Sequence, residues 1–149
     1  MEKEEKIYSF ELQNPLRPVT PVRLINPQVR REVVLDAVWD TGSTVSLIGK
    51  RTSEYLQLPE IVPRASVMGG GGRVHGRVVL TVALPGDDRY LTVVEAFEAE
   101  EITDGHEFVI GMDIISQGDL TLTHRDGHAV LEFRFGEKFC RILSSPSGK

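Results

Sequence analysis

Apolar and polar residues alternate in short segments along most of the chain, and clusters of Gly, Pro, Asn and Asp separate these segments. This pattern is typical of β-strands that bury one face. It predicts strands at residues 7–12, 19–25, 31–39, 45–48, 61–68, 77–84, 90–97, 108–111, 120–123, 128–135 and 138–143. Helices are favoured only at residues 50–58 and 112–117. We therefore predict an all-β fold, a closed barrel or sandwich, with one or two short helices.

The length of 149 residues indicates one domain. We expect it to span residues 7–143, between a flexible N-terminus at residues 1–6 and a flexible tail at residues 144–149. No stretch approaches a membrane-spanning length, and no apolar segment follows the charged first six residues. The single cysteine, Cys140, lies in an apolar run, which favours a buried structural thiol and a reducing compartment. These features predict a cytoplasmic protein with no membrane partner.

One run, Trp-Asp-Thr-Gly-Ser-Thr at residues 39–44, occurs once and carries most of the chemical information. The predicted strand at residues 31–39 delivers Asp40 onto a turn of small residues, and a capped turn is the simplest alternative. If Asp40 is catalytic, it needs a second facing carboxylate. Two like charges at close range cannot both ionise, so one of them keeps its proton. The sequence has no second Asp-Thr-Gly or Asp-Ser-Gly, so the second carboxylate must be Asp40 of another copy.

Two later segments accompany the Asp40 run. Four glycines at residues 69–72 separate two predicted strands, and the apolar run at residues 109–111 precedes the second predicted helix. With these segments in this order, the chain resembles the retropepsins, the retroviral-type aspartic proteases, and their small bacterial and cellular relatives. The resemblance covers residues 19–143 and implies a closed acid-protease-type barrel with a glycine-rich flap hairpin.

The resemblance further implies a homodimeric aspartic endopeptidase that uses no metal and no organic cofactor. Asp40 of each copy would activate water, Thr41 would brace the carboxylate pair across the two-fold axis, and Gly42 would accept a hydrogen bond from the substrate. An extended peptide would bind between the barrel and the flap, and residues 139–143 would interleave with the N-terminus at the dimer interface. The implied flap tip consists of Met68, Gly69, Gly70, Gly71 and Gly72, and the implied supporting residues are Ser43, Val109, Ile110 and Gly111.

Three positions near the implied site differ from many viral relatives. Ser43 stands where those relatives carry alanine, and a hydroxyl beside a carboxylate can donate a hydrogen bond to its ionised form. Ser43 therefore predicts a more acidic working range than alanine would give. Many viral members also carry an aspartate shortly after the catalytic triplet and an arginine after the second glycine. Residues 44–46 and Met112 occupy those positions here, so we expect that ion-pair network to be absent or replaced.

Other functions are less well supported by the sequence. The net charge of −5 argues against nucleic acid as the main partner. The glycine run lacks the helix and the Lys-Ser/Thr pair of a phosphate-binding loop. His124 and His128 have a spacing found in zinc sites, but they flank a predicted turn with no cysteine nearby, which favours an exposed pair. The main functional alternative is a non-catalytic dimeric module that binds an extended peptide on the same fold.

Overall fold

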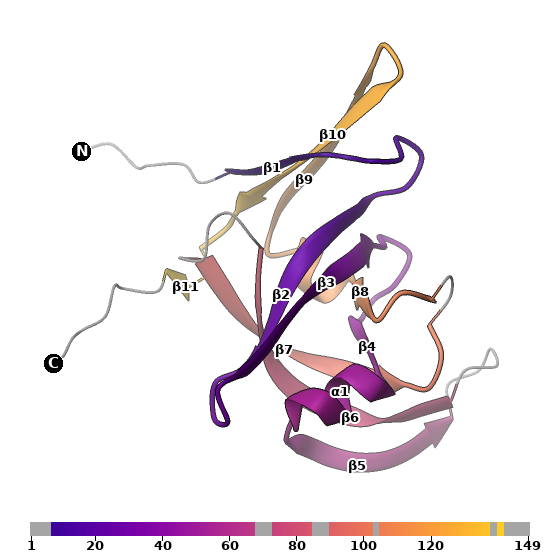
Figure 1. The fold of residues 1–149 in the computed structure, drawn as a ribbon, viewed down its shortest axis with the longest axis vertical. Helices are drawn as coiled ribbons and strands as arrows, with labels where there is room; N and C mark the ends of the chain where they lie inside the picture. The colour runs from indigo at the N-terminus through magenta and orange to yellow at the C-terminus, as the bar shows by residue number, and fades with distance from the viewer. Residues whose placement is uncertain (1–6, 68–72, 85–89, 103–104, 138–139, 142–149) are drawn as a thin grey trace, which may run out of the picture.

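The computed structural model describes residues 7–67, 73–84, 90–102, 105–137 and 140–141. Six strands close into a barrel in the order β7-β4-β8-β3-β2-β6, and β6 pairs back onto β7 (Figure 1). The barrel strands are β2 (Val19–Asn26), β3 (Arg31–Trp39), β4 (Leu47–Gly49), β6 (Arg73–Ala83), β7 (Tyr90–Ala99) and β8 (Phe108–Ile110). The prediction of an all-β fold with a closed barrel is confirmed.

The barrel combines long antiparallel hairpins with short parallel pairings. The strands β2 and β3 form one hairpin, and β6 and β7 pair antiparallel along most of their length. Closure depends on two strands of three residues each, because β8 pairs parallel to β3 and β4 pairs parallel to β7. β5 (Glu60–Val67) adds to the outside of β6, and β11 (Cys140–Arg141) adds to β7.

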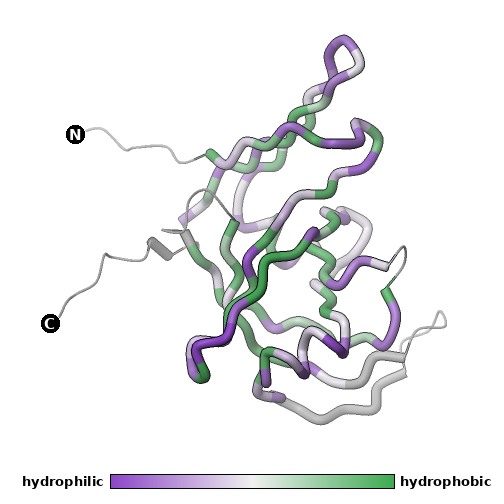
Figure 2. The backbone as a smooth tube through the Cα atoms, in the orientation of Figure 1, coloured by the Kyte–Doolittle hydropathy of each residue, from purple (hydrophilic) through white to green (hydrophobic). Residues whose placement is uncertain are grey.

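A separate antiparallel sheet of three strands, in the order β1-β10-β9, lies above the barrel in Figure 1. Its strands are β1 (Ile7–Glu11), β9 (Gly118–Arg125) and β10 (His128–Phe135). One face packs onto the barrel, where Tyr8, Leu131 and Phe133 are buried. The far end of the β9–β10 hairpin projects beyond the barrel, and Figure 2 shows polar residues at this tip.

The two helices are short and cover the ends of the barrel strands. The first, α1 (Lys50–Leu56), ends where Gln57 adopts a left-handed conformation with φ of 53°, two residues before Pro59. The sequence predicts that this helix reaches residue 58. The helix stops earlier because the left-handed backbone of Gln57 places Leu58 outside it. The second, α2 (Met112–Ile115), is a single turn after Gly111. No helix in the described residues is long and apolar enough to cross a membrane.

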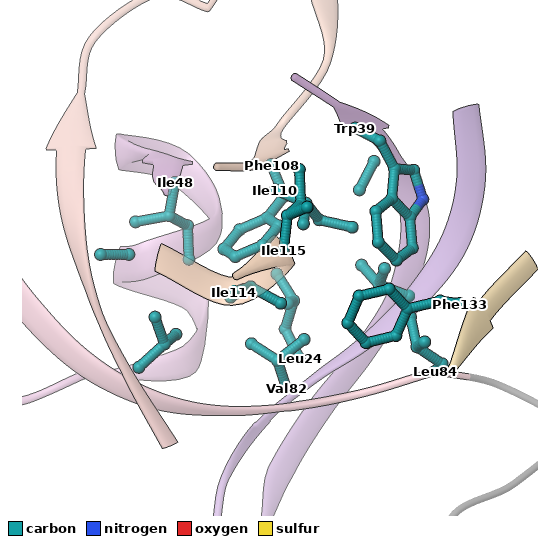
Figure 3. Close-up of a cluster of buried hydrophobic side chains, with 14 of the residues drawn as sticks. Leu24, Trp39, Ile48, Val82, Leu84, Phe108, Ile110, Ile114, Ile115 and Phe133 are labelled. Atoms are coloured by element: carbon teal, nitrogen blue, oxygen red, sulfur yellow. The ribbon is translucent and has the colours of Figure 1, made fainter. Parts of the chain in front are cut away.

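The core fills the barrel and continues to the three-stranded sheet. In β2 and in the last residues of β3, every second residue is buried, as the sequence alternation predicts for strands with one inner face. Figure 3 shows this cluster, with Phe108 and Ile110 of β8 close to the isoleucines of α2. Trp39 of β3 contacts Phe133 of β10 with ring centroids 5.3 Å apart, which joins the barrel core to the second sheet.

Several predicted boundaries need correction. The predicted strand at residues 90–97 extends to Ala99, and Glu98 within it is only 9% exposed. The predicted strand at residues 120–123 extends over Gly118–Arg125, and the predicted helix at residues 112–117 ends at Ile115. The described part of the implied interface segment at residues 139–143 pairs with β7, and β1 pairs with β10. The implied contact of these segments with a second copy stays a prediction. Residues 1–6 and 144–149 and the thiol of Cys140 lie outside the described part.

Candidate functional site

Asp40 follows the last residue of β3, where two backbone hydrogen bonds hold the chain. The Trp39 amide donates to the Pro18 carbonyl oxygen over 2.8 Å, and the Asp40 amide donates to the Ile110 carbonyl oxygen over 2.9 Å. Trp39 is buried in the barrel, whereas Asp40 is exposed. The barrel therefore fixes the backbone of Asp40 and leaves its carboxylate accessible to a ligand.

The turn after Asp40 folds back onto the carboxylate. The Gly42 amide donates to Asp40 Oδ1 over 2.9 Å, and the Ser43 amide donates to the Asp40 carbonyl oxygen over 3.1 Å. A Cβ atom at position 42 would lie 3.2 Å from Asp40 Oδ1, closer than most real contacts, so a side chain there would press on the carboxylate. One oxygen of Asp40 is thus oriented within the single chain, while Thr41 beside it is exposed.

The apolar run that accompanies Asp40 in the sequence also lies beside it in space. Val109 and Ile110 are buried in β8, which pairs with the end of β3. Gly111 is buried as well, and a Cβ atom there would overlap the carbonyl group of Val45. Glycine at 111 therefore allows the two segments to pass close together. The structure brings these three residues next to the Asp40 turn.

A hydrogen-bond network that the sequence reasoning missed joins this turn to α2. Ser46 is fully buried; its Oγ donates to Asp113 Oδ1 over 2.7 Å and accepts from the Gly111 amide over 3.1 Å. The Ser46 amide donates to Asp113 Oδ2 over 2.9 Å, and the Met112 amide donates to the Ser43 carbonyl oxygen over 2.7 Å. The sequence signal that could have indicated this network is Asp113, an acidic residue in the first turn of the helix that follows Gly111. This network occupies the region where we expected the viral ion pairs to be replaced.

In the single chain the Ser43 hydroxyl bonds a group other than the Asp40 carboxylate, and the predicted acidic working range stays a prediction. Ser43 Oγ donates to the Val45 carbonyl oxygen over 2.6 Å. Because a hydroxyl has one proton to donate, this bond takes the donor that was expected to reach Asp40. The Asp40 side chain instead accepts from a backbone amide, that of Gly42. Ser43 therefore shapes the loop between Asp40 and Ser46.

The implied flap tip lies outside the described residues. This applies to Met68, Gly69, Gly70, Gly71 and Gly72. The two strands on either side, β5 and β6, are antiparallel neighbours, and Val67 and Arg73 are register partners at their ends. The described strands therefore form the two arms of a hairpin whose connection contains the four glycines.

The histidine pair is exposed and bonded to separate groups. His124 Nε2 lies 2.8 Å from the Pro15 carbonyl oxygen, and His128 Nδ1 lies 3.0 Å from Glu11 Oε2. Within the described residues, no group of three or more His, Cys, Asp or Glu side chains is placed to hold a metal ion. The two histidines therefore have protein partners on the β1–β2 loop and on β1.

A buried tyrosine lies behind the Asp40 strand. Trp39 Nε1 donates to Thr20 Oγ1 over 2.8 Å. Burial raises the pKa of the Tyr8 hydroxyl above its usual value of 10.0, and the Thr20 side chain offsets part of that shift. The barrel side of the site is therefore a largely apolar support, in which the Trp39 indole is paired with Thr20.

Neither the known protein families nor the curated protein sequences match this chain. Solved structures do match. A retropepsin-like aspartic protease from Rickettsia conorii superimposes with a TM-score of 0.58 at 8% identity, covering 91% of this chain and 99% of that one. The retroviral protease-like domain of Ddi1 from Leishmania major gives 0.51 at 17% identity, covering 85% and 98%.

The EIAV protease, in a complex with the inhibitor HBY-793, gives a TM-score of 0.50 at 19% identity, covering 67% of this chain and 86% of that one. All three similarities are structural, at sequence identities below one fifth. They show that the chain has a retropepsin-like fold. Function must be argued from the site itself, because one fold can host different activities.

Proposed function

We propose that the chain is an aspartic endopeptidase that acts as a homodimer, with one active site formed by Asp40 of both copies. The observation that carries this proposal is the exposed Asp40 carboxylate, held by the Gly42 amide on a turn that the barrel and α2 fix in place. The retropepsin-like fold supports the same activity.

The chemistry follows from two facing carboxylates that share one proton. The ionised carboxylate takes a proton from a bound water, and the water oxygen attacks the carbonyl carbon of the peptide bond. The protonated carboxylic acid stabilises the oxygen of the tetrahedral intermediate and then supplies the proton that the leaving amine needs. No covalent adduct with the enzyme forms, and each turnover restores one shared proton.

The residues around Asp40 have proposed roles in binding. Thr41 braces the carboxylate pair across the two-fold axis, and Gly42 accepts a hydrogen bond from the substrate backbone. The glycines at residues 69–72 cover the substrate from the opposite side. The substrate is an extended peptide that pairs by backbone hydrogen bonds, as an added strand does. We expect apolar side chains to be preferred, because the strands beside the Asp40 turn, β3 and β8, are rich in apolar residues.

The decisive experiment compares Asp40→Asn with Asp36→Asn in peptide-library cleavage. Asp36 is an exposed aspartate of the same strand, so it is a matched control for the loss of one negative charge. We expect Asp40→Asn to lower kcat/KM by about 10³-fold or more, since it removes the acid–base pair, and Asp36→Asn to retain cleavage. Sedimentation and circular dichroism check that both variants stay folded and keep the assembly state of the wild type.

Two outcomes would contradict the proposal. If Asp40→Asn cleaves as fast as the wild type, Asp40 is not catalytic. If the wild type captures a statine-type peptide, a mimic of the tetrahedral intermediate, but cleaves no peptide in the library, the chain is a binding module.

A further inference from the structure

The position of β8 depends on the residues at its two ends. This strand has three residues, and only two of them pair with each of its neighbours, β3 and β4. Its last residue, Ile110, accepts the hydrogen bond from the Asp40 amide over 2.9 Å. Directly after it, the buried Gly111 passes close to the Val45 carbonyl group. Because so short a strand has few hydrogen bonds of its own, the contacts just before and just after it decide where it lies.

Glu107 holds the beginning of β8 against the beginning of α1. Its backbone carbonyl oxygen accepts from the Gly49 amide over 2.8 Å, and its side-chain Oε1 accepts from the Thr52 hydroxyl over 2.7 Å. The side chain is half-buried, and a Cβ atom at position 49 would overlap its carboxylate. Glycine at 49 therefore leaves the space that the Glu107 carboxylate fills.

The helix α1 lacks a stabilising side chain of its own at this end. Its N-cap residue is Gly49, which makes no side-chain hydrogen bond, and its first turn contains no acidic residue. A carboxylate near the start of a helix is favourable, because the free backbone N–H groups there carry partial positive charge. Glu107 thus supplies, from a segment 55 positions beyond Thr52, the acidic group that the first turn of α1 lacks.

We propose that Glu107 is a positioning residue for Asp40. The bond from Thr52 fixes Glu107, and Glu107 fixes the start of β8. At the other end of the same strand, Ile110 holds the Asp40 amide. Three residues of one strand thus connect the Glu107 side chain to the backbone of the proposed catalytic aspartate. This inference rests on the proposed function, because the position of Asp40 affects cleavage only if Asp40 is catalytic.

The first test compares Thr52→Val with Thr52→Ser in peptide cleavage. Thr52→Val replaces the hydroxyl that donates to Glu107 by a methyl group, whereas Thr52→Ser keeps the hydroxyl. A displaced reacting group slows the chemical step more than it weakens substrate binding. We therefore expect Thr52→Val to lower kcat about tenfold and to leave KM within about twofold. Thr52→Ser should keep the wild-type kcat.

A double variant tests whether the bond itself is responsible. Glu107→Leu removes the acceptor, so it should lower kcat by about as much as Thr52→Val does. Combining Glu107→Leu with Thr52→Val should cause little further loss, because both changes remove the same bond. Losses that multiply would show that the two residues act independently, which contradicts the proposal.

Asn26→Ala is the matched control, because it loosens the other end of α1. The buried Asn26 side chain donates to the carbonyl oxygens of Leu56 and Gln57 over 2.8 and 2.9 Å. We expect Asn26→Ala to lower the free energy of unfolding and to leave kcat per folded chain unchanged. Urea unfolding gives the folded fraction of each variant. If Asn26→Ala does not fold, Arg31→Met takes its place, since it removes a single bond to the last turn of the same helix.

Amide hydrogen exchange at Asp40 tests the positioning without any cleavage. The Asp40 amide is bonded to Ile110, so a loosened β8 should expose this amide more often. The reference is the set of amides in β10, which pairs with β1 and β9. We expect Thr52→Val to speed exchange at Asp40 at least about tenfold relative to β10, and Asn26→Ala to leave that ratio unchanged.

These outcomes separate the positioning role from the proposed activity. If Thr52→Val keeps the wild-type kcat, Glu107 only stabilises the fold and the inference fails, whereas the activity stands. If kcat falls but the exchange ratio does not change, the effect does not pass through β8, which also overturns the inference. The same holds if Asn26→Ala lowers kcat as much as Thr52→Val does. A wild type that cleaves no peptide contradicts the proposed function, and a raised exchange ratio in Thr52→Val would still show that Glu107 positions the Asp40 backbone.

Discussion

Removing the Ser46 hydroxyl should destabilise the chain much more than removing that of Ser43. Ser46→Ala deletes a hydrogen bond to the Asp113 side chain over 2.7 Å and leaves the buried Gly111 amide without its acceptor. A charge-assisted bond contributes about 1.5–3 kcal/mol, and an unpaired buried amide costs about 1–3 kcal/mol. Because the Ser46 amide keeps its own bond to Asp113, we expect a total loss of about 3 kcal/mol in the free energy of unfolding.

The assay is equilibrium unfolding in urea at one fixed protein concentration, because assembly also stabilises the folded state. Ser43→Ala is the matched control, since it removes a single bond to the Val45 carbonyl at a half-buried position. That variant should lose about 1 kcal/mol. In thermal unfolding, Ser46→Ala should lower Tm by about 6–12 °C for a domain of this size.

The reasoning is refuted if Ser46→Ala loses no more stability than Ser43→Ala. An equal loss would mean that water or a small backbone shift replaces the missing acceptor for Gly111. Cleavage gives an independent readout, because the network holds the segment between the Asp40 turn and α2. Ser46→Ala should lower kcat of the folded fraction, and Ser43→Ala should leave kcat close to the wild-type value.

Three further predictions follow from the same region. Gly111→Ala should lose about 3 kcal/mol or more, because its Cβ would overlap the Val45 carbonyl, and urea unfolding measures this loss. Ser43→Ala should leave the acid limb of the pH–rate profile in place, since its hydroxyl is bonded to Val45; a displaced limb would show that Ser43 reaches Asp40 in the dimer. Tyr8 has a raised pKa in the folded state, so its contribution is complete below about pH 10 and is lost as pH rises through the folded pKa. Tyr8→Phe should therefore reduce the alkaline loss of stability in pH-dependent unfolding, and an unchanged loss would contradict that assignment.

The strands were predictable because their signal is local. Alternation along β2 and the polar turn after it fix one hairpin without reference to the rest of the chain. The Asp40 turn was found in the same way, because a strand, a carboxylate and a glycine lie within four residues. The hydrogen-bond partner of the Ser43 hydroxyl is also local, but the sequence alone does not say which of several nearby acceptors the hydroxyl uses. The structure shows that the Val45 carbonyl is the one used.

Long-range pairings could not be predicted from the sequence. Ser46 and Asp113 are 67 positions apart, and neither is unusual within its own segment. The strands β4 and β8 were predicted as short segments, but their three residues each do not specify which strands they pair with, and those pairings close the barrel. The pairing of β1 with β10 joins segments more than 100 residues apart, and no pattern within either strand specifies the other.

The exposure of the Asp40 carboxylate has a thermodynamic consequence for inhibitors under the proposed function. In the proposed homodimer, an inhibitor that bridges both carboxylates would bind only the paired form, so it would tighten the association of the two copies. By reciprocity, the affinity of such an inhibitor would rise with protein concentration until all chains are paired. Potencies measured at high dilution would then underestimate how strongly the paired form is inhibited.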